Sequence, residues 1–189
     1  MNSSDQVDNY PNPEDASPMR TGVRYGIILA LIGLTFQLIT HLMGGADPSS
    51  AGGGMGSIIG CLSIVVTIAV LVQAVKHHRD KALGGFISFG QGMGVMFWLA
   101  LVYSLFTAVS NWLYSNVIAP DSQNEVKKLI EQTRARVEDG EADELELTIL
   151  ETTFQIFNNP MFVMLITFIV TIVIGAIISL IMTRSRPVS

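Results

Sequence analysis

The stretch PMFVMLITFIVTIVIGAIISLIMT, residues 160–183, decides the fold. Between Phe162 and Ile181 it holds 14 Leu, Ile, Phe or Val residues and no charged residue. At roughly −0.3 to −0.6 kcal/mol each, these residues give about −4 to −8 kcal/mol of apparent insertion energy. Pro160 is favoured in a first helical turn, and Asn159 precedes it as an N-cap. The stretch therefore predicts a transmembrane helix.

Three further intervals, 25–46, 48–75 and 82–120, also contain no Asp, Glu, Lys or Arg. Only 14% of all residues are charged, against about 25% in soluble domains. The sequence predicts an all-α integral membrane protein whose membrane domain covers residues 21–186. Its four transmembrane helices are expected at about residues 22–44, 57–75, 90–114 and 160–183.

Two polar segments lie outside these spans. Residues 1–20 are acidic and hold three of the seven prolines, which predicts a disordered cytoplasmic tail. Residues 116–159 carry ten acidic and four basic residues. Apolar residues recur there at helical spacing on both sides of Gly140, a residue suited to a helix C-terminus. We therefore expect an acidic helical hairpin between the third and fourth spans.

The cations indicate which way the chain faces. With four spans, seven of the eleven Lys and Arg residues flank one common side: Arg20, Arg24, Lys76, Arg79, Lys81, Arg184 and Arg186. Lys and Arg near helix ends mark the cytoplasmic side. We expect both termini in the cytoplasm and the acidic hairpin outside, in a bacterial inner membrane.

Two local motifs predict structure at the connection between the second and third spans. Arg79 and Asp80, followed by Gly84 and Gly85, indicate a tight structural turn against the bases of those spans. Ser88 and Gln91 then have the spacing of a capping box, in which each side chain meets the backbone of the other residue. Asn159 and Pro160 form the corresponding cap of the fourth span.

Small residues at four-residue spacing predict close helix packing. The pairs are Gly22 and Gly26, Gly52 and Gly56, Gly56 and Gly60, Gly90 and Gly94, and Gly175 and Ser179. Lipid supplies little hydrophobic drive between helices, so such positions let backbones approach closely. Packing within one chain is favoured over contact in a homo-oligomer, which stays an alternative.

Polar residues that could carry chemistry are few. Gln37 and His41 are the polar intramembrane candidates, and His41 has no acidic partner in view. His77 and His78 with Asp80 raise the question of a metal, but adjacent helical positions point about 100° apart and do not share one ion easily. We expect no catalytic residues, no metal and no cofactor. The net charge of −5 excludes a nucleic-acid surface.

The segment Arg79-Asp80, Gly84-Gly85-x-Ile87-Ser88-Phe89 and the layout around it resemble a known family. From about Arg24 to Arg184 the chain is similar to the uncharacterised bacterial membrane proteins of domain of unknown function 4199. The resemblance implies four spans, a helical hydrophilic loop before the last span, and an Asn-Pro near its start, which Asn159-Pro160 matches. The long acidic N-terminus departs from the family's usual short start. The resemblance implies no activity.

The sequence therefore predicts a non-enzymatic accessory or scaffold subunit. Its expected partners are the lipid bilayer and either a membrane or periplasmic protein or further copies of the chain. The alternative is a small oligomeric transporter or channel for an unidentified solute. The scarcity of ionisable groups within the spans disfavours ion-coupled transport.

Overall fold

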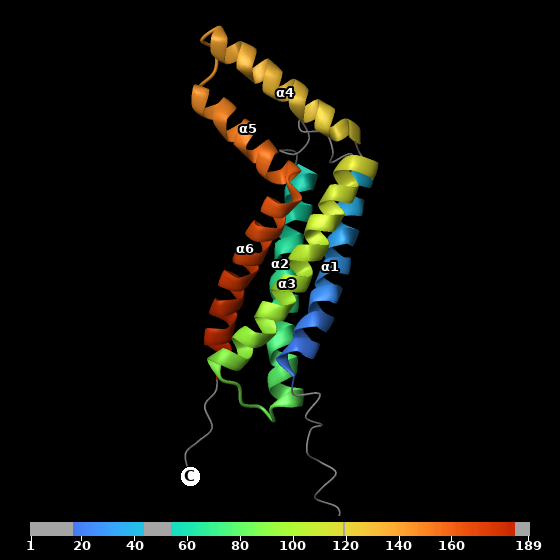
Figure 1. Cartoon of the computed structure of the whole chain (residues 1–189), viewed down its shortest axis with the longest axis vertical. Helices are drawn as coiled ribbons and strands as arrows, with labels where there is room; N and C mark the ends of the chain where they lie inside the picture. The colour runs from blue at the N-terminus through green and yellow to red at the C-terminus, as the bar shows by residue number, and fades with distance from the viewer. Residues whose placement is uncertain (1–16, 44–53, 119, 184–189) are drawn as a thin grey trace, which may run out of the picture. The chain divides into compact units, whose positions relative to one another are not determined.

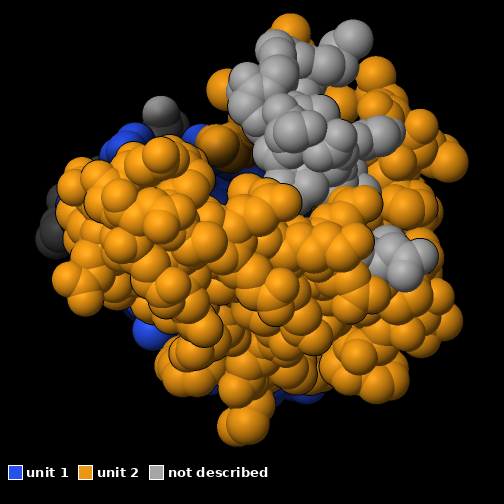
Figure 2. All heavy atoms as spheres, turned by 90° about the horizontal axis from the view of Figure 1, so that it is seen from above, with its two compact units in different colours: residues 1–29, 66–103, 168–189 blue, residues 30–65, 104–167 orange. Residues whose placement is uncertain are grey.

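A computed structural model describes residues 17–43, 54–118 and 120–183. By contacts within the chain it divides into two compact units, coloured separately in Figure 2. Unit 1 comprises residues 1–29, 66–103 and 168–189, and unit 2 comprises residues 30–65 and 104–167. The predicted outer turn (44–53), most of the N-terminal tail (1–16), and Arg184 and Arg186 lie outside the described residues.

The described residues are dominated by helices, four of which are long and apolar enough to cross a membrane. They are α1 (Pro18–Leu42), α2 (Gly54–His77), α3 (Phe89–Leu113) and α6 (Pro160–Met182), each 23 to 25 residues long. At 1.5 Å per residue each helix reaches about 35 Å, enough for the hydrocarbon core. The prediction of an all-helical chain with four candidate spans is confirmed, and Figure 1 shows these helices.

Several helix ends differ from the predicted bounds by one to four residues, and two of these differences have a physical reason. Helix α1 begins at Pro18, not Gly22, because proline suits a first helical turn and the carbonyl of Ser17 accepts from the Thr21 N–H at 3.4 Å. Helix α2 does not end at Val75. It runs to His77 and continues as a π-helical turn, η2 (His78–Ala82), since its buried residues keep helical spacing through the basic segment.

Unit 1 contains the apolar core. Its buried residues come from α1, α2, the segment before α3, α3 and α6: Leu29, Leu71, Ala74, Val75, Ile87, Val95, Met96, Leu99 and Ile178. Glycines let the helices meet closely around this core. A Cβ on Gly22 would lie 2.5 Å from the Val95 carbonyl oxygen, and one on Gly175 would lie 2.8 Å from Met96 Cγ. The small residues of α1 and α6 therefore pack within the chain and allow the close helix contacts that are typical of membrane proteins.

Unit 2 contains the helical hairpin, whose helices α4 (Pro120–Glu138) and α5 (Glu144–Asn158) are visible in Figure 1. Gly140 has φ +73°, and its N–H donates to Val137 O at 3.1 Å while the Glu141 N–H donates to Arg136 O at 2.8 Å. This pair of bonds is a Schellman motif, which ends α4 at the residue that the sequence indicates. Arg134 of α4 donates to Glu151 of α5 at 2.6 Å, which ties the two helices together.

Apolar side chains are exposed along the candidate spans. On α6 the exposed residues recur every four positions, at Met161, Leu165, Ile169, Val173 and Ile177. A continuous apolar stripe of this length is unfavourable in water. Beside lipid chains it costs nothing, because they are as apolar as the stripe itself. The four helices thus have the surface of a multi-pass membrane protein.

Candidate functional site

The structure brings the four predicted turn residues together at the end of α2. Arg79 Nε donates to Asp80 Oδ1 at 2.7 Å, and the Gly85 N–H donates to the Arg79 carbonyl at 2.9 Å. Gly84 and Gly85 have φ of +65° and +94°. Residues with a Cβ rarely adopt this left-handed region, so glycine is required where the chain leaves η2 and returns toward α3.

The predicted capping residues lie at the starts of α3 and α6. Ser88 Oγ accepts from the Gln91 N–H at 3.3 Å, and the Ser88 N–H donates to Gln91 Oε1 at 3.0 Å. This is the reciprocal geometry of a capping box. At α6, Asn159 Oδ1 accepts from the Met161 N–H at 3.0 Å. These contacts satisfy backbone donors that a helix start otherwise leaves open.

A buried histidine in unit 1 was not foreseen as a core residue. His78 is fully buried, and its Nδ1 lies 3.1 Å from Thr21 Oγ1 of α1. Its Nε2 has no hydrogen-bond partner among the described residues. The spacing of Leu71, Val75, His78 and Ala82 places all four on one helical face. That spacing was the signal available in the sequence, and the charges around His78 obscured it.

His41 has a partner that the sequence did not reveal. Its Nδ1 lies 3.0 Å from the Tyr114 hydroxyl, and the two rings meet edge to face at a centroid distance of 5.4 Å. Tyr114 begins a second π-helical turn, η3 (Tyr114–Ile118), directly after α3. The partner is a phenol and not an acidic side chain. Gln37, one turn earlier on α1, is half-buried.

The hairpin presents two different faces of α5. One face, with Leu147, Leu150 and Phe154, is partly buried. The other leaves Leu145 and Ile149 exposed to 69% and 57%. The hydrogen bond that Arg134 donates to Glu151 raises the pKa of the Arg134 guanidinium. Arg134 and Glu151 form a charge-assisted hydrogen bond with each other, so this ion pair has a structural role in the hairpin.

The end of α5 is fastened to α3 within unit 2. Asn111 Nδ2 donates to the Phe157 carbonyl at 2.7 Å. Near the start of α4, Gln123 Nε2 donates to the Ser115 carbonyl of η3 at 3.0 Å. Both helices of the hairpin are thus attached to the end of the third candidate span. Residue spacing alone gives no signal for the long-range partner of Asn111.

The neighbouring histidines at the end of α2 face different surroundings. No group of three or more His, Cys, Asp or Glu residues that could hold a metal ion occurs among the residues that the structure describes. The His77 ring contacts the Tyr25 ring in a tilted geometry, with 5.7 Å between the ring centroids and 53° between the ring planes, whereas His78 faces the core. The two neighbouring imidazoles therefore point into different surroundings, as their helical spacing predicts.

Comparison with curated proteins and with solved structures finds no match. Comparison with family models finds one, described as protein of unknown function (DUF4199), over residues 24–183. The match covers well over half of the 189 residues. The matched residues include most of α1 and all of the later helices from α2 to α6. They also include the Arg79-Asp80 turn and the caps at the starts of α3 and α6. The chain belongs to the DUF4199 family.

Proposed function

We propose that this protein is a non-enzymatic accessory or scaffold subunit of a bacterial inner membrane, which binds a partner protein through the α4–α5 hairpin. In this proposal α1, α2, α3 and α6 cross the bilayer. The exposed apolar stripe along α6 and the lengths of all four helices support this arrangement. An exposed apolar surface of that length is unfavourable in water.

The orientation rests on where the cations lie. Arg20, Arg24, Lys76, Arg79 and Lys81 all belong to unit 1, where α1 begins and α2 ends; we call this part of unit 1 the basic end. Lys and Arg beside the ends of spans favour the cytoplasmic side. Both termini are then cytoplasmic, and the hairpin lies outside.

The observation that carries the proposal is the uncovered face of α5. Leu145 and Ile149 are one helical turn apart and more than half exposed, in a segment that the orientation places in water. Apolar residues exposed together in water mark a contact surface. Glu144 and Glu146 flank Leu145, and residues 116–159 carry six more acidic than basic residues. The matching partner surface is apolar at its centre and edged with Lys or Arg.

The test combines purification with crosslinking. The tagged full-length protein is purified from its own membrane in mild detergent, with a photocrosslinking residue in place of Ile149. The expected result is a stoichiometric second protein that crosslinks at position 149. The variant Leu145→Ser/Ile149→Ser is expected to lose this protein in the purification. The control Lys127→Ser/Lys128→Ser changes exposed residues of α4 and is expected to retain it.

Three outcomes would contradict the proposal. The second protein could be retained by the variant that lacks residues 122–157, although that variant still inserts. The crosslink could join two copies of this chain, which would favour a homo-oligomer. Purified protein alone could carry a solute across liposome membranes, which would favour the transporter or channel. The buried His78, with one ring nitrogen unpartnered, is the observation that keeps transport as the second candidate.

A further inference from the structure

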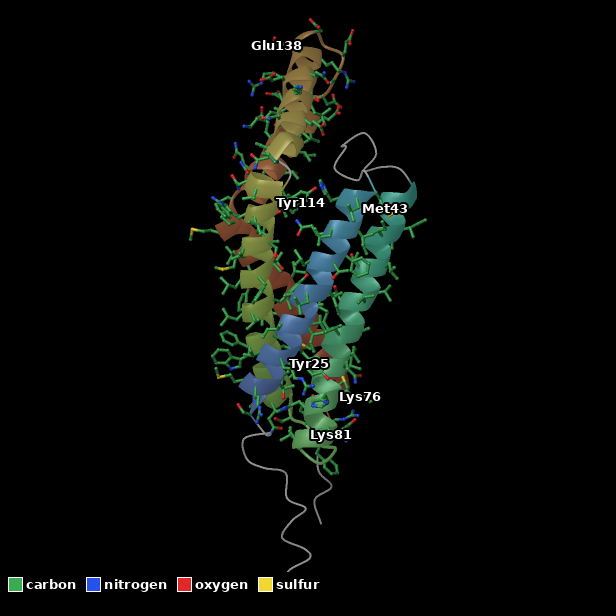
Figure 3. The ribbon with its side chains drawn as sticks, turned by 90° about the vertical axis from the view of Figure 1, so that its right-hand side faces the viewer. Tyr25, Met43, Lys76, Lys81, Tyr114 and Glu138 are labelled. Atoms are coloured by element: carbon green, nitrogen blue, oxygen red, sulfur yellow. The ribbon has the colours of Figure 1, made fainter. Side chains whose placement is uncertain are left out.

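The two helices at the basic end lie side by side along a defined seam. Thr21 of α1 contacts His78 at 3.1 Å, and Tyr25 of α1 contacts His77 at 5.7 Å between ring centroids. Figure 3 shows Tyr25 near Lys76 and Lys81 at this end. The residues adjacent to the seam in each helix are therefore brought close to one another.

Those adjacent residues are cations. Arg24 precedes Tyr25, and Arg20 shares its face one turn earlier. Lys76 precedes His77, and Lys81 follows at the end of η2. Arg24, Lys76 and Lys81 are exposed, and in the described part of the chain no carboxylate lies within ion-pair distance of them. Arg79 differs, because Asp80 pairs with it at 2.7 Å.

Next to the cations, both helices become apolar in the same direction. On α1, exposed Ile27 and Ile28 follow Arg24 by one turn. On α2, which runs the opposite way, partly buried Val70 lies about two turns before His77, on the face of α2 that meets α1. The surface of this helix pair is positively charged at its end and apolar further along the helices. A lipid with an anionic headgroup and an apolar acyl chain has the same arrangement. A free anion would meet only the charged part of this surface.

We propose that the α1–α2 seam at the basic end binds an anionic phospholipid, with its phosphate between Arg24 and Lys81 and an acyl chain along Ile28 and Val70. The inference rests on the membrane insertion proposed above and does not use the hairpin. Clusters of Lys and Arg next to spans favour anionic lipids by charge, and their long side chains reach the headgroup level.

The test measures lipid binding to the purified full-length protein in neutral detergent. Short-chain phosphatidylglycerol and short-chain phosphatidylcholine are titrated separately, and bound lipid is counted by native mass spectrometry. We expect phosphatidylglycerol to bind more tightly. The variant Arg24→Gln/Lys81→Gln should weaken its binding about 25-fold, roughly fivefold for each cation removed. Arg24→Lys/Lys81→Arg keeps both charges and should retain the affinity.

The control Lys127→Gln/Lys128→Gln removes the same charge from α4 and should leave binding unchanged. Equal loss in this control would overturn the proposal, because net charge alone would then explain the effect. Equal binding of the two lipids to the unmodified protein would also overturn it, whether or not the variants fold. Displacement of the lipid by an equal concentration of inorganic phosphate would point to a free anion instead. Deletion of residues 122–157 should preserve lipid binding, which separates this test from that of the hairpin.

Discussion

The basic end of unit 1 and the hairpin of unit 2 are both helical, but they are held together in different ways. At the basic end, α1 approaches α3 so closely that glycine is needed, as at Gly22 against Val95. In the hairpin, larger apolar side chains such as Leu147 and Leu150 occupy the half-buried face of α5, and an ion pair joins Arg134 to Glu151.

The difference follows from the surroundings that each region is proposed to have. In lipid, apolar side chains gain little by leaving their surroundings, so helices associate through close backbone contact and dispersion forces. In water, burying an apolar face is itself favourable, and helices need not approach as closely. The chain thus adds glycine at helix contacts where lipid is expected, whereas the hairpin, where water is expected, relies on larger apolar residues and an ion pair. Four substitutions test this contrast.

The largest effect is expected from Gly22→Leu. Its Cβ would lie 2.5 Å from the Val95 carbonyl oxygen and 2.7 Å from Trp98 Cβ, so α1 would have to move away from α3. Overpacking of this kind costs about 3 kcal/mol or more. The measurement is thermal unfolding in detergent, with Gly60→Leu as the control, because a Cβ there meets nothing within 4 Å. Equal melting temperatures for the two variants would show that the α1–α3 contact is not close.

The next largest effect is expected from His78→Ala. The substitution leaves the buried Thr21 hydroxyl without its partner and opens a cavity, since His78 is fully buried. An unsatisfied buried hydroxyl alone costs about 1–3 kcal/mol. His77→Ala, which removes a partly exposed ring, serves as the control in the same unfolding experiment. A larger loss of stability in the His77→Ala control would mean that the contact between His77 and Tyr25 stabilises the end of α2 more than the buried His78 ring does.

A smaller effect is expected from Asp80→Ala. The carboxylate pairs with Arg79 at the surface, with side-chain exposures of 16% for Arg79 and 40% for Asp80. Pairs this exposed contribute about 0–1 kcal/mol. The variant should melt slightly earlier in low salt, and the difference should shrink as salt screens the pair. An unchanged melting profile in low salt would show that Gly84 and Gly85 alone shape the turn.

The smallest effect is expected from Arg134→Gln in the hairpin. Arg134 is exposed, and its raised pKa means that the contact with Glu151 gains stability from the charged guanidinium. A group whose pKa is raised on folding adds stability at lower pH and loses it only as the pH rises through that raised value. For arginine this lies far above neutrality, so Arg134 should cause no pH dependence near neutral pH. A clear loss of α4–α5 helicity by circular dichroism would show that the ion pair, not apolar contact, holds the hairpin.

The sequence predicted the features that depend on local pattern. The charge-free intervals located the four long helices, Gly140 located the end of α4, and the Ser88–Gln91 spacing located a capping box. These features depend on residues a few positions apart. The partners of His78 and His41 lie 57 and 73 residues away in the sequence. Their identity depends on how the helices pack, which residue spacing within one helix does not encode.

The end of α2 was misplaced for a related reason. Charged residues after Val75 were read as the start of a connection, but the buried face continues through His78 to Ala82. The charges project from the sides of η2 while its inner face stays apolar around one imidazole. Charge marks where a helix leaves lipid, and not where the helix itself stops.

Asn159 is the only residue between α5 and α6, and it serves both helices. Its N–H donates to the Ile156 carbonyl at the end of α5, while its side chain and carbonyl accept from Met161 and Val163 at the start of α6. With a single connecting residue held by three hydrogen bonds, the end of α5 and the start of α6 have little freedom to move independently. A pull or twist applied to the hairpin by anything bound there is passed on to α6 as a mechanical load.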